Sequence, residues 1–189
     1  DDQTLFLVAE DTCHKMNVSD GAPRQSQKMP QLIDEQPHHW GYVARANDLL
    51  LGSGRKPESS YYRQSREADL ALWYDNMSLV TSSYLFGLPA EGGPPTWTYQ
   101  SGVVINSTIT IGGNRLYFLE SHAEKALKNE TGRMPMSAFL GGDCFLVALD
   151  LKTGTQLWKQ PYDLSNCQHI VYLNYAQEKL IVSGNRYVN

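Results

Sequence analysis

The chain lacks the features that mark several protein classes. Its 189 residues carry a net charge of −4 and its basic residues are scattered, whereas a nucleic-acid-binding surface needs a basic stripe. No apolar run approaches the roughly 20 residues of a membrane-spanning helix. No signal peptide precedes the first strand-like run, so Asp1 is expected to mark an internal or processed start.

Cysteine is scarce, and its spacing excludes two kinds of site. Cys13, Cys144 and Cys167 form no C-x-x-C pair, which excludes a zinc knuckle and a c-type haem attachment within this chain. Two alternatives stay open: one disulfide with one free thiol, or three reduced thiols that act as small core residues.

Common catalytic and metal-binding motifs are missing as well. The sequence contains no glycine-rich phosphate loop, no H-E-x-x-H motif and no spacing typical of a Ser-His-Asp triad. His122 and Glu124 are two residues apart and would not share a helical face. We therefore expect no metal site.

The residues that are abundant indicate a turn-rich β protein. Hydrophobic residues make up 41% of the chain and charged residues 19%, with 15 glycines, 9 prolines and 11 tyrosines. These fractions are typical of a globular domain. Glycine and proline favour turns, and tyrosine favours strands.

An internal repeat organises the chain. The segment Tyr84–Trp97 aligns without a gap on Phe145–Trp158, 61 residues later. In each copy an apolar strand leads into a glycine-containing turn, and the strand after the turn carries a tryptophan. Other segments, each a polar turn before an apolar strand, alternate with these copies: Asn47–Ser53, Asn114–Ser121 and Glu178–Gly184. A further strand-like run precedes each of them: Tyr42–Arg45, Val103–Ile111 and Ile170–Tyr175.

Each unit therefore predicts four antiparallel strands. One such sheet cannot bury both of its faces, but sheets stacked radially can. We expect an all-β fold, a β-propeller fragment of about three incomplete four-stranded antiparallel blades with short helical insertions. The expected parts are the end of a preceding blade plus an irregular linker (1–37), a blade (38–102) with an insertion at about 54–78, a blade (103–163) with an insertion at about 121–142, and the first strands of a further blade (164–189).

The stretch Leu146–Trp158 resembles the docking motif Ala-x-Asp-x-x-x-Gly-x-x-x-Trp of pyrroloquinoline-quinone-like (PQQ-like) repeats, which occur in β-propellers of the quinoprotein alcohol dehydrogenase-like kind. The resemblance implies that the tryptophan packs on the neighbouring blade. In the degenerate first copy, Pro89 stands where the motif has aspartate. The docking residues that the resemblance implies are Ala148, Asp150, Gly154 and Trp158, with Gly87, Gly93 and Trp97 in the first copy.

The same resemblance implies two broad uses. Some family members are enzymes that hold PQQ and calcium, and others are binding or assembly scaffolds without a quinone. The vicinal Cys-Cys and the C-x-x-C-H of the enzymes are not in this chain. We therefore expect a non-catalytic scaffold, periplasmic or secreted, whose partners are the remaining blades of the parent chain and a protein or carbohydrate ligand. The alternatives are a dehydrogenase that uses PQQ and calcium, and an accessory propeller domain of a larger enzyme.

Two polar segments are candidate ligand sites. In the first insertion, Ser65–Tyr74 predicts a short helix that leads into the cluster Trp73, Tyr74, Asp75 and Asn76. The alternative is that these residues pack the insertion and cap a turn. Asn166 and His169 precede a strand and form the second candidate.

Overall fold

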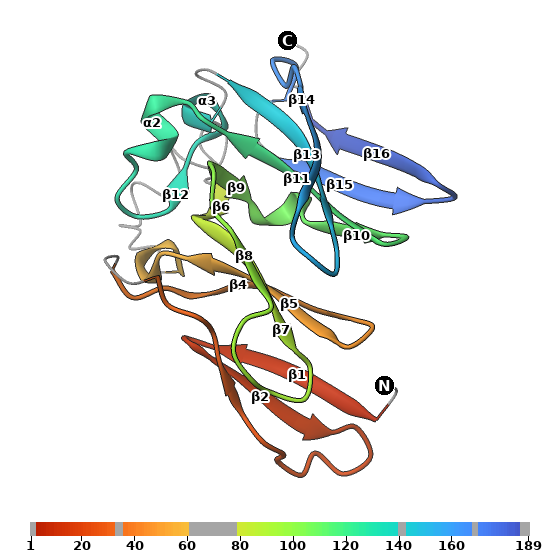
Figure 1. The fold of residues 1–189 in the computed structure, drawn as a ribbon. Helices are drawn as coiled ribbons and strands as arrows, with labels where there is room; N and C mark the ends of the chain where they lie inside the picture. The colour runs from red at the N-terminus through yellow and green to blue at the C-terminus, as the bar shows by residue number, and fades with distance from the viewer. Residues whose placement is uncertain (1–2, 33–35, 61–78, 140–142, 168–169, 186–189) are drawn as a thin grey trace.

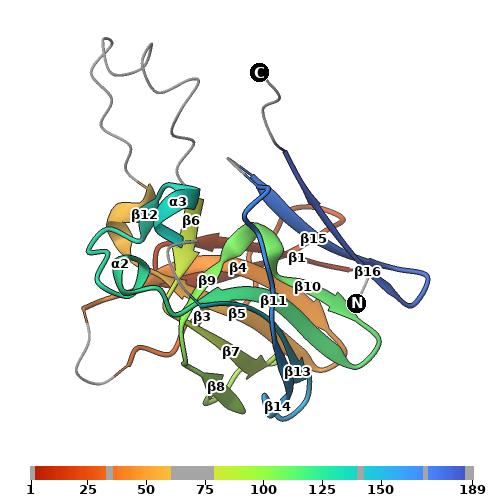
Figure 2. The ribbon, with the colours of Figure 1, turned by 90° about the horizontal axis from the view of Figure 1, so that it is seen from above.

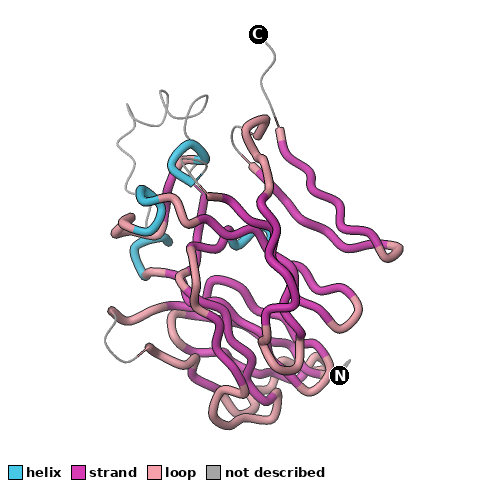
Figure 3. The backbone as a smooth tube through the Cα atoms, turned by 45° about the horizontal axis from the view of Figure 1, so that its top comes forward, coloured by secondary structure: helices cyan, strands magenta, loops and turns pink. Residues whose placement is uncertain are grey.

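The computed structural model describes residues 3–32, 36–60, 79–139, 143–167 and 170–185. Antiparallel sheets follow one another from the N-terminal end to the C-terminal end, and most of the backbone is strand (Figures 1 and 3). None of the helices in the described ranges has the length and apolar character needed to cross a lipid bilayer.

The first complete blade is a four-stranded antiparallel sheet in the order β4-β5-β7-β8. Its side chains alternate between two faces, as the strand geometry requires, and both faces of its central strands are buried. Asn47, with a φ of 54°, turns the chain between β4 and β5. The strands are β4 (His39–Ala46), β5 (Leu49–Arg55), β7 (Tyr84–Pro89) and β8 (Trp97–Tyr99).

The second complete blade repeats this arrangement with β10 (Thr110–Gly112), β11 (Arg115–Ser121), β13 (Cys144–Asp150) and β14 (Gln156–Pro161). The predicted strand Val103–Ile111 is divided into β9 (Val103–Ile105), the 3-10 turn η2 (Asn106–Thr108) and β10. Thr108 stabilises this break because its hydroxyl donates to the Ile105 carbonyl (2.8 Å) and accepts from the Leu119 amide (3.0 Å).

A smaller sheet lies at each end of the stack. The N-terminal sheet contains β1 (Thr4–Ala9), β2 (Thr12–Asn17) and β3 (Gln27–Lys28), in that order. The C-terminal hairpin pairs β15 (Val171–Ala176) with β16 (Lys179–Gly184). β2 was not predicted, and β3 falls within the segment expected to be irregular.

The described elements in and next to the two insertions lie at one side of the molecule (Figure 2). β6 does not pair within the first blade; it pairs with β9 on one edge and with β12 on the other. Chain from the first insertion therefore extends the sheet of the second blade. The insertion elements are η1 (Pro57–Ser60), β6 (Leu79–Ser82), α2 (Glu124–Leu127), β12 (Arg133–Met134) and α3 (Met136–Phe139).

Candidate functional site

The predicted ligand cluster cannot be placed, because Trp73, Tyr74, Asp75 and Asn76 lie outside the described residues, as do the rest of the predicted helix Ser65–Tyr74 and His169. Asn166 is exposed in the connection between β14 and β15. The ligand-site predictions for these residues therefore stay predictions.

Trp97 joins the two complete blades. It lies opposite Gly87 in the β7-β8 pairing. A Cβ atom on Gly87 or on Gly154 of the second blade would come within 2.6 Å or 2.5 Å of the Trp97 ring. The Trp97 indole Nε1–H donates to the Leu151 carbonyl (3.1 Å). The ring therefore fills the space between a glycine of its own blade and a glycine of the next.

Lys15 makes the equivalent contact one blade earlier. Its ammonium donates to the Ala90 carbonyl, and Ala90 precedes Leu151 by the 61 residues of the repeat. β2 therefore contacts the first blade where β8 contacts the second. The turn in between contains Gly93, whose φ of 134° suits glycine, and the Gly92 amide donates to the Pro89 carbonyl (3.0 Å).

Trp158 lies opposite a small residue of its own blade, as Trp97 does. Ala148 pairs with Trp158 across β13 and β14, and the Trp158 ring lies 5.9 Å from that of Tyr117. Trp158 is half-buried. Asp150 accepts from the amides of Lys152 (3.0 Å) and Thr153 (2.9 Å). Hydrogen bonds from the Thr153 amide and hydroxyl lower the pKa of Asp150, so this carboxylate caps the turn.

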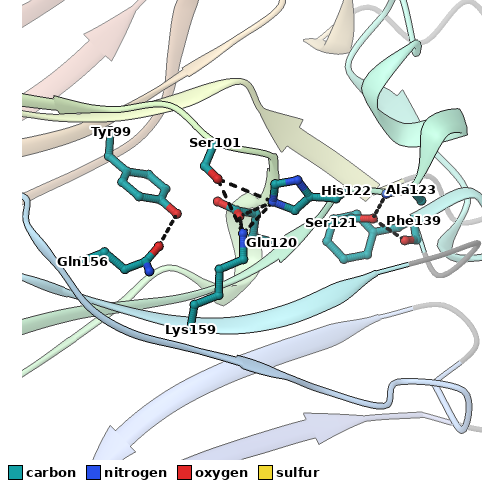
Figure 4. A network of polar contacts seen from close by, with 9 residues as sticks. All are labelled: Tyr99, Ser101, Glu120, Ser121, His122, Ala123, Phe139, Gln156 and Lys159. Carbon is teal, nitrogen blue, oxygen red and sulfur yellow. Dashed lines mark hydrogen bonds and ion pairs between the residues drawn. The ribbon is translucent and has the colours of Figure 1, made fainter.

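A polar cluster lies between the two complete blades (Figure 4). Its centre is Glu120 on β11, which is fully buried. Glu120 Oε1 is 2.6 Å from Lys159 Nζ and 2.6 Å from His122 Nε2. The Lys159 ammonium also lies 4.5 Å from the centroid of the Phe145 ring. The Ser101 hydroxyl of the first blade lies 3.5 Å from both the Lys159 and the His122 nitrogens.

The cluster holds a buried negative charge. Burial by itself raises the pKa of Glu120, but hydrogen bonds from Lys159 and His122 outweigh it and leave that pKa below its ordinary value. Burial and then the Glu120 charge raise the pKa of Tyr99 across the interface. Glu120 is therefore a carboxylate and Tyr99 a neutral phenol at neutral pH.

The cluster does not have the geometry of a nucleophilic triad, although it contains serine, histidine and glutamate. In such a triad the nucleophile and the acid contact different ring nitrogens of the histidine. Here Ser101 Oγ and Glu120 Oε1 both face His122 Nε2. A proton cannot be taken at one nitrogen while the acid orients the other, so the arrangement supports an interblade contact and not acyl transfer.

A cavity of about 770 Å³ lies next to this cluster. It is lined by the connection Gln100–Val103, by Gln36 and His38 ahead of β4, and by residues in and next to both insertions. Its apolar lining residues include Val103, Leu127 and Met134. Its uncharged polar lining residues include Gln36, Thr81, Ser83 and Ser101. Its size falls within the range of small-molecule sites.

Hydrogen bonds between the insertions shape this cavity. Lys56 Nζ donates to the Asn129 carbonyl (2.6 Å). The Thr81 amide and hydroxyl both donate to the Gly132 carbonyl (3.0 and 2.9 Å). Asn129 Oδ1 accepts from the Gly132 amide (2.6 Å), which fixes the turn where Gly132 has a φ of 72°.

The described residues contain no cluster of metal-binding side chains. Calcium takes six to eight oxygen ligands, mainly carboxylates and carbonyls, and no group of three or more His, Cys, Asp or Glu side chains gathers within the described ranges. The buried carboxylate of Glu120 is already bound to Lys159. In the cavity, the ammonium of Lys56 donates to a backbone carbonyl.

The cysteine alternatives are resolved in favour of reduced thiols. All three cysteines are free, and Cys13 and Cys144 are buried. Burial raises the pKa of the Cys13 thiol to about 11. It also raises the pKa of Cys144 and of Cys167, so these thiols are protonated at neutral pH and weakly reactive.

Comparison with solved structures identifies the fold. No family model and no curated protein matches the chain. BamB from Moraxella catarrhalis aligns over 96% of this chain and 40% of its own, with a TM-score of 0.52 and 9% identity. The fold is that of a β-propeller. The predicted fold is thus confirmed, and the chain spans two fifths of the length of BamB.

Two further structures align with the propeller segment less closely. A europium-containing methanol dehydrogenase aligns over 84% of this chain and 23% of its own, with a TM-score of 0.48 and 10% identity. The computationally designed Ika8 protein aligns over 96% of this chain and 52% of its own, with a TM-score of 0.39 and 9% identity.

Sequence reasoning missed the polar cluster of this propeller segment. One signal was present, because Glu120 is a lone acid at the end of the apolar run Leu116–Leu119. Acids are seldom fully buried unless they are paired, so Glu120 required a cationic partner. The sequence did not indicate which cation pairs with Glu120, because Lys159 lies 39 residues further along the chain.

Proposed function

We propose that this chain is part of a PQQ-like β-propeller that serves as a non-catalytic binding scaffold, and that its ligand binds in the cavity between the two insertions. The observation that carries this proposal is the cavity itself, about 770 Å³ in volume and lined by chain from two consecutive blades. The remaining blades of the parent are its structural partners, and a periplasmic or extracellular location stays a prediction from the resemblance.

The lining favours an uncharged polar ligand. Thr81, Ser83 and Ser101 line the cavity beside apolar residues such as Leu127. The cavity also contains Lys56 and the acids Glu58 and Glu130, so charges of both signs line it. A hydroxyl-rich ligand suits such a surface, because a few placed polar groups orient it while apolar groups bury its carbon face. We therefore favour a carbohydrate over a protein segment.

Oligosaccharide binding by the 189-residue chain tests the proposal. Cello-, malto- and chito-oligosaccharides would be screened by thermal shift, since a ligand that binds only the native state raises the melting temperature. Isothermal titration would then measure the affinity of any hit. Leu127→Arg should weaken binding at least about tenfold, or about 1.4 kcal/mol, because it puts a charged side chain into the cavity.

Leu157→Arg is the matched control. Leu157 is about as exposed as Leu127 but does not line the cavity, so this variant should bind like the parent sequence. No saturable binding of any oligosaccharide, or equal loss in both variants, would contradict the proposal. Saturable binding of PQQ with calcium to the parent propeller would favour the dehydrogenase alternative instead.

A further inference from the structure

The polar cluster around Glu120 lies directly against one wall of the cavity, the connection Gln100–Val103, here called the interblade wall. A Cβ atom on Gly102 of this wall would come within 2.8 Å of Glu120 Cγ and 2.9 Å of His122 Nε2. The hydroxyl of the neighbouring Ser101 lies 3.5 Å from His122 Nε2. The wall and the cluster are therefore in close contact, so a change in the cluster is transmitted to the wall.

A second wall of the cavity starts at the same cluster. His122 follows β11, and its amide donates to the Asp143 carbonyl (2.8 Å). Two residues later α2 begins, and its residues Ala126 and Leu127 line the cavity from the side of the second insertion. His122 therefore lies where the interblade wall meets the wall that α2 forms.

His122 Nε2 has two neighbours that require opposite protonation states (Figure 4). It lies 2.6 Å from Lys159 Nζ and 2.6 Å from Glu120 Oε1. An ammonium only donates hydrogen bonds, and a carboxylate only accepts them. Without a proton, Nε2 accepts from Lys159. With a proton, it donates to Glu120, and its positive charge faces that of Lys159. Protonation of His122 must therefore change the arrangement of the cluster.

The structure indicates how the second arrangement forms. Glu120 Oε2 is buried and has no hydrogen-bond partner among the described residues, so Lys159 can turn to this oxygen when His122 is charged. The side chains of His122 and Lys159 are 30% and 19% exposed, which leaves both of them a path toward solvent. Their nitrogens each lie 3.5 Å from Ser101 Oγ. Repulsion between the two cations would separate them and remove at least one of these contacts with the interblade wall.

Histidine is the group through which pH acts on this cluster. Of the side-chain types present, it is the one whose charge ordinarily changes between about pH 5 and 8. β13 faces the His122 ring with the uncharged ring of Phe145, at 5.5 Å. Glu124, Lys125 and Asp143 are exposed, so solvent screens their charges. The titratable groups of the adjoining segments are Glu120 on β11, Lys159 on β14, Tyr99 on β8, Glu124 and Lys125 on α2, and Asp143 ahead of β13.

We propose that His122 is a positioning residue for the cavity: uncharged, it holds the interblade wall in place, and protonated, it releases the wall, so that ligand binding weakens as the pH falls. This inference rests on the proposed function, because it needs a ligand in the cavity. His38, Glu58 and Glu130 also line the cavity and titrate independently of the cluster, so the test compares variants and not pH values alone.

Nuclear magnetic resonance of the ligand-free 189-residue chain tests the positioning role. Between about pH 8 and 5.5, the amide signals of Gly102, Val103 and Leu127 should shift with the same midpoint as the ring protons of His122. His122→Gln removes the titrating group, so the shifts with that midpoint should disappear. His14→Gln is the matched control and should keep them, because His14 is exposed on β2 and does not line the cavity.

Isothermal titration tests the effect on binding, with whichever cello-, malto- or chito-oligosaccharide raises the melting temperature. Between about pH 8 and 5.5, the unmodified chain should lose at least about fivefold more affinity than His122→Gln. His14→Gln should behave like the unmodified chain. The contributions of His38, Glu58 and Glu130 are present in all three chains, so the comparison removes them.

An equal loss of affinity in the unmodified chain and in His122→Gln would overturn the proposal and leave the proposed function intact. A pH response of Gly102 without Val103 and Leu127 would also overturn it, because it would report the nearby charge and not a moved wall. If no oligosaccharide binds, the proposed function fails, while the amide titration still decides whether His122 positions the interblade wall.

Discussion

At the scale of single residues, the docking tryptophans differ in how much stability they contribute. Trp97 is 7% exposed and contacts glycines of two blades, whereas Trp158 is only half-buried. Trp97→Ala should lower the free energy of unfolding by about 3–5 kcal/mol, and Trp158→Ala by about 1–2 kcal/mol, because less buried area is lost. Urea denaturation measures both, and equal losses would show that Trp97 does not dock the blades.

The buried ion pair of Glu120 with Lys159 should affect both the stability and its dependence on pH. Removing one partner of a buried ion pair typically costs about 3–5 kcal/mol, so Lys159→Met should be strongly destabilising at pH 7. The folded-state pKa of Glu120 is lowered in the native chain. Its contribution to stability is therefore complete above the ordinary carboxyl pKa and is lost as the pH falls through the lower folded value.

In Lys159→Met, the contribution of Glu120 to stability should depend on pH in the opposite direction. Without Lys159, burial dominates and should raise the pKa of Glu120 above its ordinary value, so lowering the pH from 7 toward 4 should reduce the stability deficit of Lys159→Met. Glu120→Gln combined with Lys159→Met removes the titrating group and isolates this effect from His122. A deficit that is the same at every pH in the single and the double variant would mean that Glu120 carries no buried charge.

At the scale of elements, the sequence predicted what depends on local pattern. The strands of both repeats follow from apolar runs between glycine- and asparagine-containing turns, and they are confirmed. β6 and β12 were missed, because each is only four or two residues long and forms through pairing with a distant segment. The division of Val103–Ile111 was missed for a similar reason, since Thr108 is held by Leu119 on a neighbouring strand.

The candidate site was also missed, because it depends on contacts between distant segments. Its cavity lies between two insertions that are far apart in the sequence, and its shape depends on contacts such as Lys56 with Asn129, 73 residues apart. From residue type alone, the sequence predicted a ligand site at the aromatic residues Trp73 and Tyr74 of the first insertion. The cluster around Glu120 needed the registers of β11 and β14 on the same blade, which no local pattern determines.

At the scale of the whole molecule, the blades should differ in local stability. In a linear array of sheets, each sheet is stabilised mainly by its neighbours, and the two complete blades each have neighbours on both faces. The N-terminal sheet and the C-terminal hairpin have one neighbour each, so their amides should exchange with solvent hydrogen faster than those of β5, β7, β11 and β13. Hydrogen exchange of the 189-residue chain, followed by mass spectrometry or NMR, measures this order.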